Sequence, residues 1–158
     1  MKHRFILIGL LITLLAACTE QVDITPYDFP KVFTGESSRS WKLRSLQLIR
    51  EGKGAVPLTV RACEADDIYT FYFNSDRRYT VSNGASKCSD SEPDDLVDSN
   101  WGFINSTSTL TIMMPLFGDG DIPFTLKEAD DTKMTIDIYV DEAKTAAYRV
   151  NLRVTSGE

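Results

Sequence analysis

The chain has 158 residues and a formal net charge of −6. Its first 17 residues have the pattern of a removable export signal, so we expect a mature protein of 141 residues, which suits one domain. Removal of Lys2, His3 and Arg4 with that segment makes the charge −8 and takes away the only histidine. The mature chain therefore has no Ser-His-Asp or Cys-His catalytic unit and no histidine-ligated zinc. Its negative charge also opposes binding to nucleic acid.

The N-terminal segment resembles the signal of a bacterial lipoprotein. A short basic start is followed by the apolar run Phe5 to Leu15, which is shorter than the roughly 20 residues of a membrane span. The tetrapeptide Leu15-Ala16-Ala17-Cys18 then resembles the lipobox, in which the cysteine is acylated and the peptide is cut just before it. The resemblance implies a lipoprotein signal peptide over 1–17 and a lipid on Cys18.

The expected anchor leads into a tether. Several acyl chains on Cys18 would hold the protein stably on a membrane. Thr19 stands where aspartate favours inner-membrane retention in enterobacteria, so we expect an outer-membrane anchor, with the domain facing the periplasm or the surface. Residues 18–36 contain prolines, a glycine and scattered acids without periodicity, and we interpret them as a lipidated tether.

Two cysteines remain once Cys18 is assigned to lipid. In an exported protein, Cys63 and Cys88 favour one disulfide. The chain-entropy account gives such a cross-link about 3 kcal/mol. The alternative is a metal or redox site, which would need C-x-x-C spacing or nearby histidines, and the mature chain has neither.

The rest of the chain, 37–158, is a series of short runs rich in β-branched and aromatic residues, separated by turn residues. The predicted strands cover 41–50, 57–61, 68–73, 78–82, 100–104, 109–114, 122–127, 133–140 and 147–155. Asn83-Gly84 is predicted to turn with positive φ, and 85–99 is predicted to be a loop.

Period-two alternation in the later runs decides the fold class. Met134, Ile136 and Ile138, for example, share one face, so each strand has one buried and one solvated side. We predict an all-β domain over 37–158, an antiparallel meander of about eight strands closed into a lipocalin-like barrel, because closure removes exposed edges. A β-sandwich is the alternative.

Several motifs resemble the lipocalin-like lipoproteins of Bacteroidetes, over roughly residues 41–155. They are Trp41-Lys42-Leu43, the stretch from Cys63 through an acidic pair to Phe71, then Asp76, Tyr79, Gly84, Cys88, Trp101 and Leu110-Thr111-Ile112. The resemblance implies the barrel architecture more than an activity. Arg39 stands two residues before Trp41, where the lipocalin hallmark Gly-x-Trp has glycine.

Aromatic side chains are the candidates for lining a ligand cavity. An eight-stranded barrel is either filled by side chains or holds one small ligand, and aromatic residues also build ordinary cores. The candidates are Trp41, Phe71, Phe73, Tyr79, Trp101, Phe103 and Phe124.

Acidic residues give further hypotheses. Asp66-Asp67 offers oxygen ligands for calcium, although a solvated turn beside the disulfide is the favoured interpretation. The stretch 118–121 lacks the remaining ligands of an EF-hand and is interpreted as a turn. An acidic run forms either a solvated loop or a surface for a basic protein. Its acids are Asp90, Glu92, Asp94, Asp95 and Asp98.

Together these features predict a non-enzymatic cell-envelope lipoprotein that binds a small apolar or amphipathic ligand in a β-barrel. No cofactor, metal or nucleic-acid partner is expected. The alternative is a protein-interaction module, either an inhibitor of a basic hydrolase or an accessory subunit of an outer-membrane complex. Paired carboxylates are the remaining catalytic chemistry, and the sequence identifies no pair placed for glycoside cleavage.

Overall fold

The computed structural model describes residues 29–155. The predicted signal peptide (1–17), the lipidation site Cys18 and the tether up to residue 28 lie outside the described residues, as do residues 156–158. Within the described part of the chain, no helix is long and apolar enough to cross a membrane.

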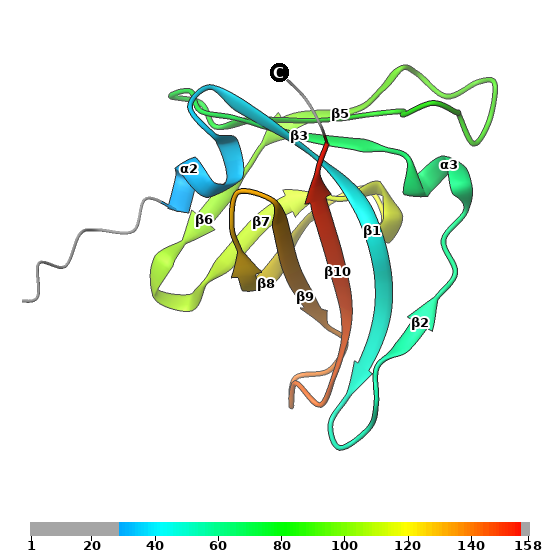
Figure 1. The fold of residues 1–158 in the computed structure, drawn as a ribbon, viewed down its shortest axis with the longest axis vertical. Helices are drawn as coiled ribbons and strands as arrows, with labels where there is room; N and C mark the ends of the chain where they lie inside the picture. The colour runs from blue at the N-terminus through cyan, green and yellow to red at the C-terminus, as the bar shows by residue number, and fades with distance from the viewer. Residues whose placement is uncertain (1–28, 156–158) are drawn as a thin grey trace, which may run out of the picture.

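An antiparallel sheet curls into a nearly closed barrel (Figure 1). Nine strands follow one another in the order β5-β4-β3-β1-β10-β9-β8-β7-β6, and β2 pairs with β1 beside this path. The predicted all-β antiparallel meander barrel is thus confirmed. The strands are β1 (Ser38–Arg50), β2 (Val56–Leu58), β3 (Ile68–Tyr72), β4 (Arg78–Ser82), β5 (Asp95–Asn100), β6 (Gly102–Ile104), β7 (Thr109–Met113), β8 (Asp121–Ala129), β9 (Lys133–Tyr139) and β10 (Ala146–Val154). The helices are α2 (Phe29–Thr34) and α3 (Ala62–Ala65), with 3₁₀ turns η1 (Asn105–Thr107) and η2 (Pro115–Phe117).

The two ends of the strand order are consecutive in the sequence. β5 pairs with β4, β6 pairs with β7, and only Trp101 separates β5 from β6. The backbone N–H of Trp101 donates to the Arg77 carbonyl at 2.8 Å, and its ring is buried in the interior. One continuous stretch of chain therefore bends at Trp101 and brings the two edges of the sheet together.

The structure differs from the prediction in two segments. Residues 95–99, predicted as loop, form β5 together with Asn100, and Val97 pairs with Val81; the surrounding acids Asp95 and Asp98 obscure the alternation of this strand in the sequence. Residues 29–34, predicted as tether, form α2, and Phe33 is fully buried. Packing on the barrel therefore begins before residue 37.

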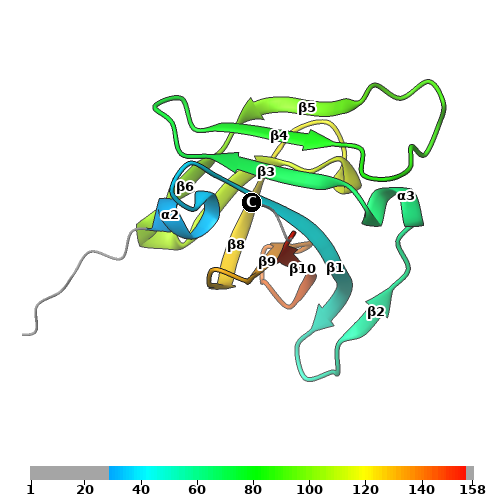
Figure 2. The same cartoon turned by 45° about the horizontal axis from the view of Figure 1, so that its top comes forward.

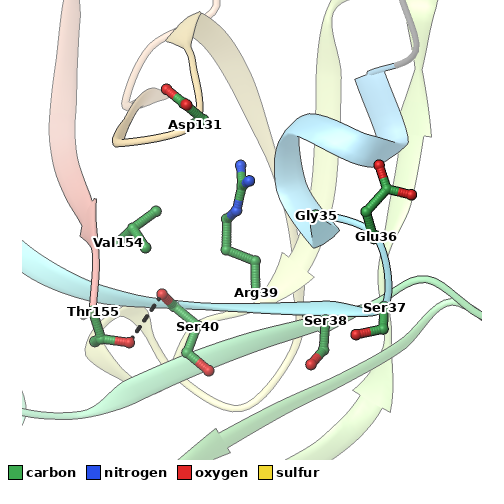
Figure 3. Close-up of a pocket in the computed structure, with 9 residues that line it drawn as sticks. All are labelled: Gly35, Glu36, Ser37, Ser38, Arg39, Ser40, Asp131, Val154 and Thr155. Atoms are coloured by element: carbon green, nitrogen blue, oxygen red, sulfur yellow. Dashed lines mark hydrogen bonds between the residues drawn. The ribbon is translucent and has the colours of Figure 1, made fainter. Parts of the chain in front are cut away.

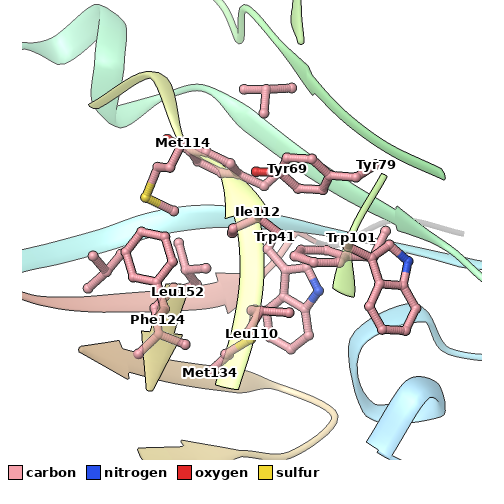
Figure 4. Packing of buried hydrophobic residues seen from close by; sticks show 14 of the residues in the cluster. Trp41, Tyr69, Tyr79, Trp101, Leu110, Ile112, Met114, Phe124, Met134 and Leu152 are labelled. Atoms are coloured by element: carbon pink, nitrogen blue, oxygen red, sulfur yellow. The ribbon is translucent and has the colours of Figure 1, made fainter. Parts of the chain in front are cut away.

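Side chains fill the barrel interior (Figure 4). Among the predicted lining residues, the fully or almost fully buried ones are Trp41, Phe71, Tyr79, Trp101 and Phe124. The Phe71 ring centroid lies 4.9 Å from that of Tyr79, so these aromatic groups pack on one another as a core. Phe103 is partly buried against this core. Phe73 is 47% exposed, because β3 ends at Tyr72, and it lies outside the interior.

The helix α2 closes one end of the barrel. Its Phe33 side chain has no exposed surface and meets the Trp101 ring edge to face, with centroids 5.8 Å apart. The indole N–H of Trp41 donates to the Phe33 carbonyl at 2.9 Å, which satisfies a polar group inside the core. The helix α3 lies at the opposite end of the barrel, as both overall views show (Figures 1 and 2).

Phe33→Ala tests how much the packing of α2 at the end of the barrel stabilises the domain. Because the side chain is fully buried among aromatic rings, we expect the free energy of unfolding to fall by about 3–5 kcal/mol. Urea denaturation followed by tryptophan fluorescence measures this change. The control Lys31→Ala removes only an exposed ion pair with Glu36 and should change stability by less than about 1 kcal/mol. Equal effects of the two substitutions would show that α2 does not hold the barrel closed.

Candidate functional site

A buried carboxylate lies at the α3 end of the barrel. Asp67 directly precedes β3 and has the same parity as Tyr69 and Phe71, so the pleat points it toward the interior. The residue is only 4% exposed, and its Oδ1 atom is buried with no hydrogen-bond partner among the described residues. Buried polar atoms are nearly always hydrogen-bonded, and an unpaired carboxylate is costly, so Asp67 is an exception that needs a reason.

Asp67 lines a cavity of about 140 Å³, which we call the cup. The helix α3 and the β4–β5 loop supply polar walls, whereas β5 and η2 supply an apolar wall formed by Leu96, Pro115 and Leu116. The cup is therefore amphipathic. Its lining residues are Arg61, Glu64, Asp67, Asn83, Cys88, Glu92, Leu96, Pro115 and Leu116.

The other two carboxylates of the cup already have partners. Glu64 accepts a hydrogen bond from the Arg61 guanidinium at 2.8 Å, and this pairing lowers the pKa of Glu64. Glu92 accepts the backbone N–H of Cys88 at 2.8 Å. Of the acidic groups that line the cup, Asp67 is thus the one with a buried, unpartnered oxygen.

The surroundings of Asp67 disfavour its charge. Burial raises the pKa of Asp67 to about 7, and the negative charges of Asp66, Glu92 and Glu64 add to this effect. Lys42 opposes the rise only weakly. A carboxyl group that changes its charge near neutral pH and has no partner can bind a donor that enters the cup.

Tyr79 is another buried residue with an unsatisfied oxygen. It is fully buried, and its hydroxyl oxygen has no hydrogen-bond partner among the described residues. Burial raises the pKa of Tyr79, and the charges of Tyr69 and Asp67 contribute, which places these groups within electrostatic reach of one another. Tyr79 pairs with Phe71, whose ring also contacts Phe33 of α2, and it does not line the cup.

Covalent and hydrogen-bonding links hold the walls of the cup together. The disulfide between Cys63 and Cys88 joins α3 to the β4–β5 loop with a Cα–Cα distance of 5.1 Å, which confirms the predicted pairing. Asp66 Oδ2 accepts hydrogen bonds from the Ala85 backbone N–H and the Ser86 hydroxyl, both at 3.0 Å. The cup is thus built from two segments that are distant in sequence and fixed to each other.

Gly84 allows these two segments to approach. A Cβ atom at this position would lie 2.0 Å from the carbonyl oxygen of Asp66. The φ angle of Gly84 is not positive, so the prediction of a positive-φ turn at Asn83-Gly84 is wrong. Glycine is required here by the close contact between two backbones rather than by a left-handed conformation.

The two hypotheses for the Asp66-Asp67 pair are both revised. Asp66 does sit in a turn beside the disulfide, but Asp67 is buried rather than solvated. Residues 29–155 contain no group of three or more His, Cys, Asp or Glu side chains that could hold a metal ion, which gives calcium no support. The sequence signal that could have located Asp67 is its parity with Tyr69 and Phe71, one step before the strand begins.

The acidic run is partly neutralised by neighbouring cations. Asp94 forms an ion pair with Lys87 at 2.7 Å, and Asp98 accepts two hydrogen bonds from Arg78, both at 2.9 Å. Glu92 faces the cup. Only part of the predicted acidic surface is therefore unpaired and available to a basic partner.

A second pocket lies at the α2 end (Figure 3). It measures about 530 Å³ and is polar, and its central cation, Arg39, donates to the Val32 carbonyl at 2.8 Å. The Thr155 hydroxyl donates to the Ser40 carbonyl at 3.2 Å. None of the buried, unpartnered side-chain atoms of the described residues lines this pocket. The cup is therefore the stronger candidate site.

The chain matches no family model, no curated protein and no solved structure. The nearly closed antiparallel barrel is consistent with a lipocalin-like fold. The resemblance to the lipocalin-like lipoproteins stays a prediction.

Gly84→Ala tests the contact that shapes the cup. The new Cβ atom would overlap a backbone oxygen that cannot rotate away, so we expect the free energy of unfolding to fall by about 1–3 kcal/mol. Gly54→Ala is the matched control, because a Cβ atom there would meet nothing within 4 Å and the φ of Gly54 is not positive. It should change stability by less than about 0.5 kcal/mol. A neutral Gly84→Ala would mean that the two segments are not held in this contact.

Asp67→Asn tests how much the buried charge of Asp67 destabilises the folded protein. The unfolded chain releases the Asp67 proton near its ordinary pKa of 3.8, whereas the folded protein keeps it until about pH 7. The contribution of Asp67 to stability therefore falls as pH rises through this window and is lowest above pH 7. We expect Asp67→Asn to be more stable than the wild type by about 1–3 kcal/mol at pH 8 and equal to it near pH 4.

The measurement is the difference in unfolding free energy between variant and wild type across that pH range. Asp90→Asn, at an exposed acid of the acidic run, is the control and should change stability by less than about 0.5 kcal/mol. A difference for Asp67→Asn that does not vary with pH would rule out a destabilising charge at Asp67.

Proposed function

We propose that this protein is a non-enzymatic, lipid-anchored lipoprotein of the outer membrane, and that its barrel binds a small amphipathic ligand in the cup at the α3 end. The observation that carries this proposal is the buried carboxylate of Asp67, which has an oxygen without a hydrogen-bond partner and lines a cavity with an apolar wall. Because the centre of the barrel is filled by aromatic and aliphatic side chains, the binding position moves from the middle of the barrel to its rim.

The size of the cup limits the ligand. Pockets for drug-sized molecules measure about 300–1,000 Å³, whereas an engineered cavity of about 150 Å³ holds benzene. The cup, at about 140 Å³, therefore fits a ligand, or the buried head of one, with roughly six to eight heavy atoms. Leu96 and Leu116 would contact its apolar part and Asp67 its polar part, which supports an amphipathic rather than a purely apolar ligand.

The arrangement favours binding over turnover. Hydrolysis by two carboxylates would need a second available carboxylate across the site from Asp67. Glu64 is paired with Arg61, and Glu92 accepts a backbone hydrogen bond. Neither is poised to act with Asp67 as an acid–base pair.

Access to the cup fits the proposed anchor. The helix α2, the first described element after Cys18 in the sequence, lies at one end of the barrel, and α3 lies at the other (Figure 2). The cup is lined by Arg61 and Glu64 of the α3 segment. A domain tethered at its α2 end presents the cup away from the attachment point. The alternative of a basic protein partner has less support, since Lys87 and Arg78 already pair with two acids of the acidic run.

Native mass spectrometry of the full-length lipoprotein, extracted from bacterial membranes in mild detergent, tests the proposal. We expect a bound small molecule on the wild type, and Leu116→Trp, which fills the cup, should lower the bound fraction about tenfold or more. Ile104→Trp, at an exposed position of β6 near the α2 end, is the control and should retain the molecule. A wild type without a bound molecule, or equal occupancy in Leu116→Trp, would contradict ligand binding in the cup.

A further inference from the structure

We propose that the cup selects a monocation: its ligand carries an ammonium group that pairs with Asp67, on a compact apolar body held by Leu96, Pro115 and Leu116. This inference rests on the proposed function, because it names the chemical class of the ligand for the same cup. It adds a charge requirement that the shape of the cup alone does not impose.

The charge around Asp67 favours a cationic ligand. The carboxylates of Asp66, Glu64 and Glu92 act on it together, and Lys42 is the one opposing cation among the groups that influence its titration. The guanidinium of Arg61, which also lines the cup, is bonded to Glu64 at 2.8 Å. An anionic ligand would meet this negative field without an available cation, whereas a cation would be attracted to it.

The carboxylate of Asp67 lacks a hydrogen-bond partner that an ammonium group would supply. Asp67 Oδ1 is buried without a hydrogen bond, and an ionised carboxylate left in that state carries a large desolvation penalty. An ammonium group brings both the opposite charge and N–H donors, and charge-assisted hydrogen bonds are about twice as strong as neutral ones. A neutral hydroxyl would satisfy the oxygen but leave the charge uncompensated.

The volume of the cup fits a small organic cation. The cup holds a group of about the size of benzylammonium, with the ring against Leu96 and Leu116 and the nitrogen toward Asp67. A metal ion would not use the apolar wall, and the described residues offer no metal-binding cluster. The combination of one buried carboxylate with an aliphatic wall therefore suits an organic cation.

Binding of a cation would be coupled to pH. The ligand pairs with ionised Asp67, whose pKa burial raises to about 7, so ionised Asp67 and affinity both increase through neutral pH. Between pH 5.5 and 8.5 the ionised fraction of such a group increases about thirtyfold. The charged and titratable groups that face Asp67 are Arg61, Glu64 and Asp66 from the α3 segment, Glu92 from the β4–β5 loop, Lys42 from β1, and the buried phenols Tyr69 and Tyr79 from β3 and β4.

Three probes of nearly equal shape test the inference: benzylammonium, benzyl alcohol and benzoate. Each is titrated calorimetrically into the full-length lipoprotein in a non-ionic detergent, at pH 5.5 and 8.5. We expect benzylammonium to bind, with a dissociation constant about thirtyfold lower at pH 8.5, and benzyl alcohol and benzoate to bind at least about tenfold more weakly. Asp67→Asn should weaken benzylammonium binding about tenfold or more, and Asp90→Asn should leave it unchanged.

The outcomes separate this inference from the proposed function. Benzyl alcohol binding as tightly as benzylammonium at pH 8.5, or tighter benzylammonium binding in Asp67→Asn, would overturn the cation requirement while leaving a ligand-binding cup. Benzylammonium binding that persists in Leu116→Trp would place the cation outside the cup and also overturn the inference. The proposed function fails separately, if the native lipoprotein carries no small molecule that Leu116→Trp displaces.

Discussion

The pairing of β1 along both of its edges is the interaction on which the rest of the structure depends. This strand runs from Ser38 to Arg50 and pairs with β10 over nearly its whole length, with β3 along its first part and with β2 along its second. Since the first and last strands would otherwise leave open edges, this pairing joins the β3–β5 half and the β6–β9 half into one sheet, whose two ends then meet at Trp101. Its inward-facing Trp41 donates its indole N–H to the Phe33 carbonyl and so also holds α2. Large side chains packed around Trp41 leave little room at the centre, and the available binding space lies at the rim.

At the rim, the stability of the barrel outweighs the cost of burying the Asp67 carboxylate. Asp67 points into the barrel because it directly precedes β3. The Cys63–Cys88 disulfide and the hydrogen bonds of Asp66 fix the α3 segment to the β4–β5 loop beside it. Unsatisfied polar groups persist in a folded protein only when surrounding interactions outweigh their penalty, and they cluster at functional sites. A cationic ligand would remove that penalty on binding, so part of the binding energy would come from the unfavourable state of Asp67 in the unliganded protein.

The sequence by itself determined the fold class, because period-two alternation and turn residues are local signals that each strand carries independently. It also predicted the Cys63–Cys88 pair from the cysteine count and the expected compartment. It did not locate β5, where acids interrupt the apolar pattern, or α2, whose burial depends on a barrel end that forms elsewhere. Likewise, Phe73 is an aromatic residue of the kind that builds cores, but it is exposed because β3 ends one residue before it.

Only the tertiary structure decided the character of the site. Asp67 has the same chemistry as Asp66 beside it, and the sequence suggested a solvated turn for both. Each has one buried oxygen without a partner, but Asp66 is held by hydrogen bonds at its other oxygen, whereas Asp67 is buried as a whole and lines the cup beneath the β4–β5 loop and η2. Gly84 likewise has its role because two backbones meet there. The local sequence pattern specifies which way a side chain points, whereas its burial and charge environment depend on non-local contacts. Those contacts made the Asp67 carboxylate a candidate binding group.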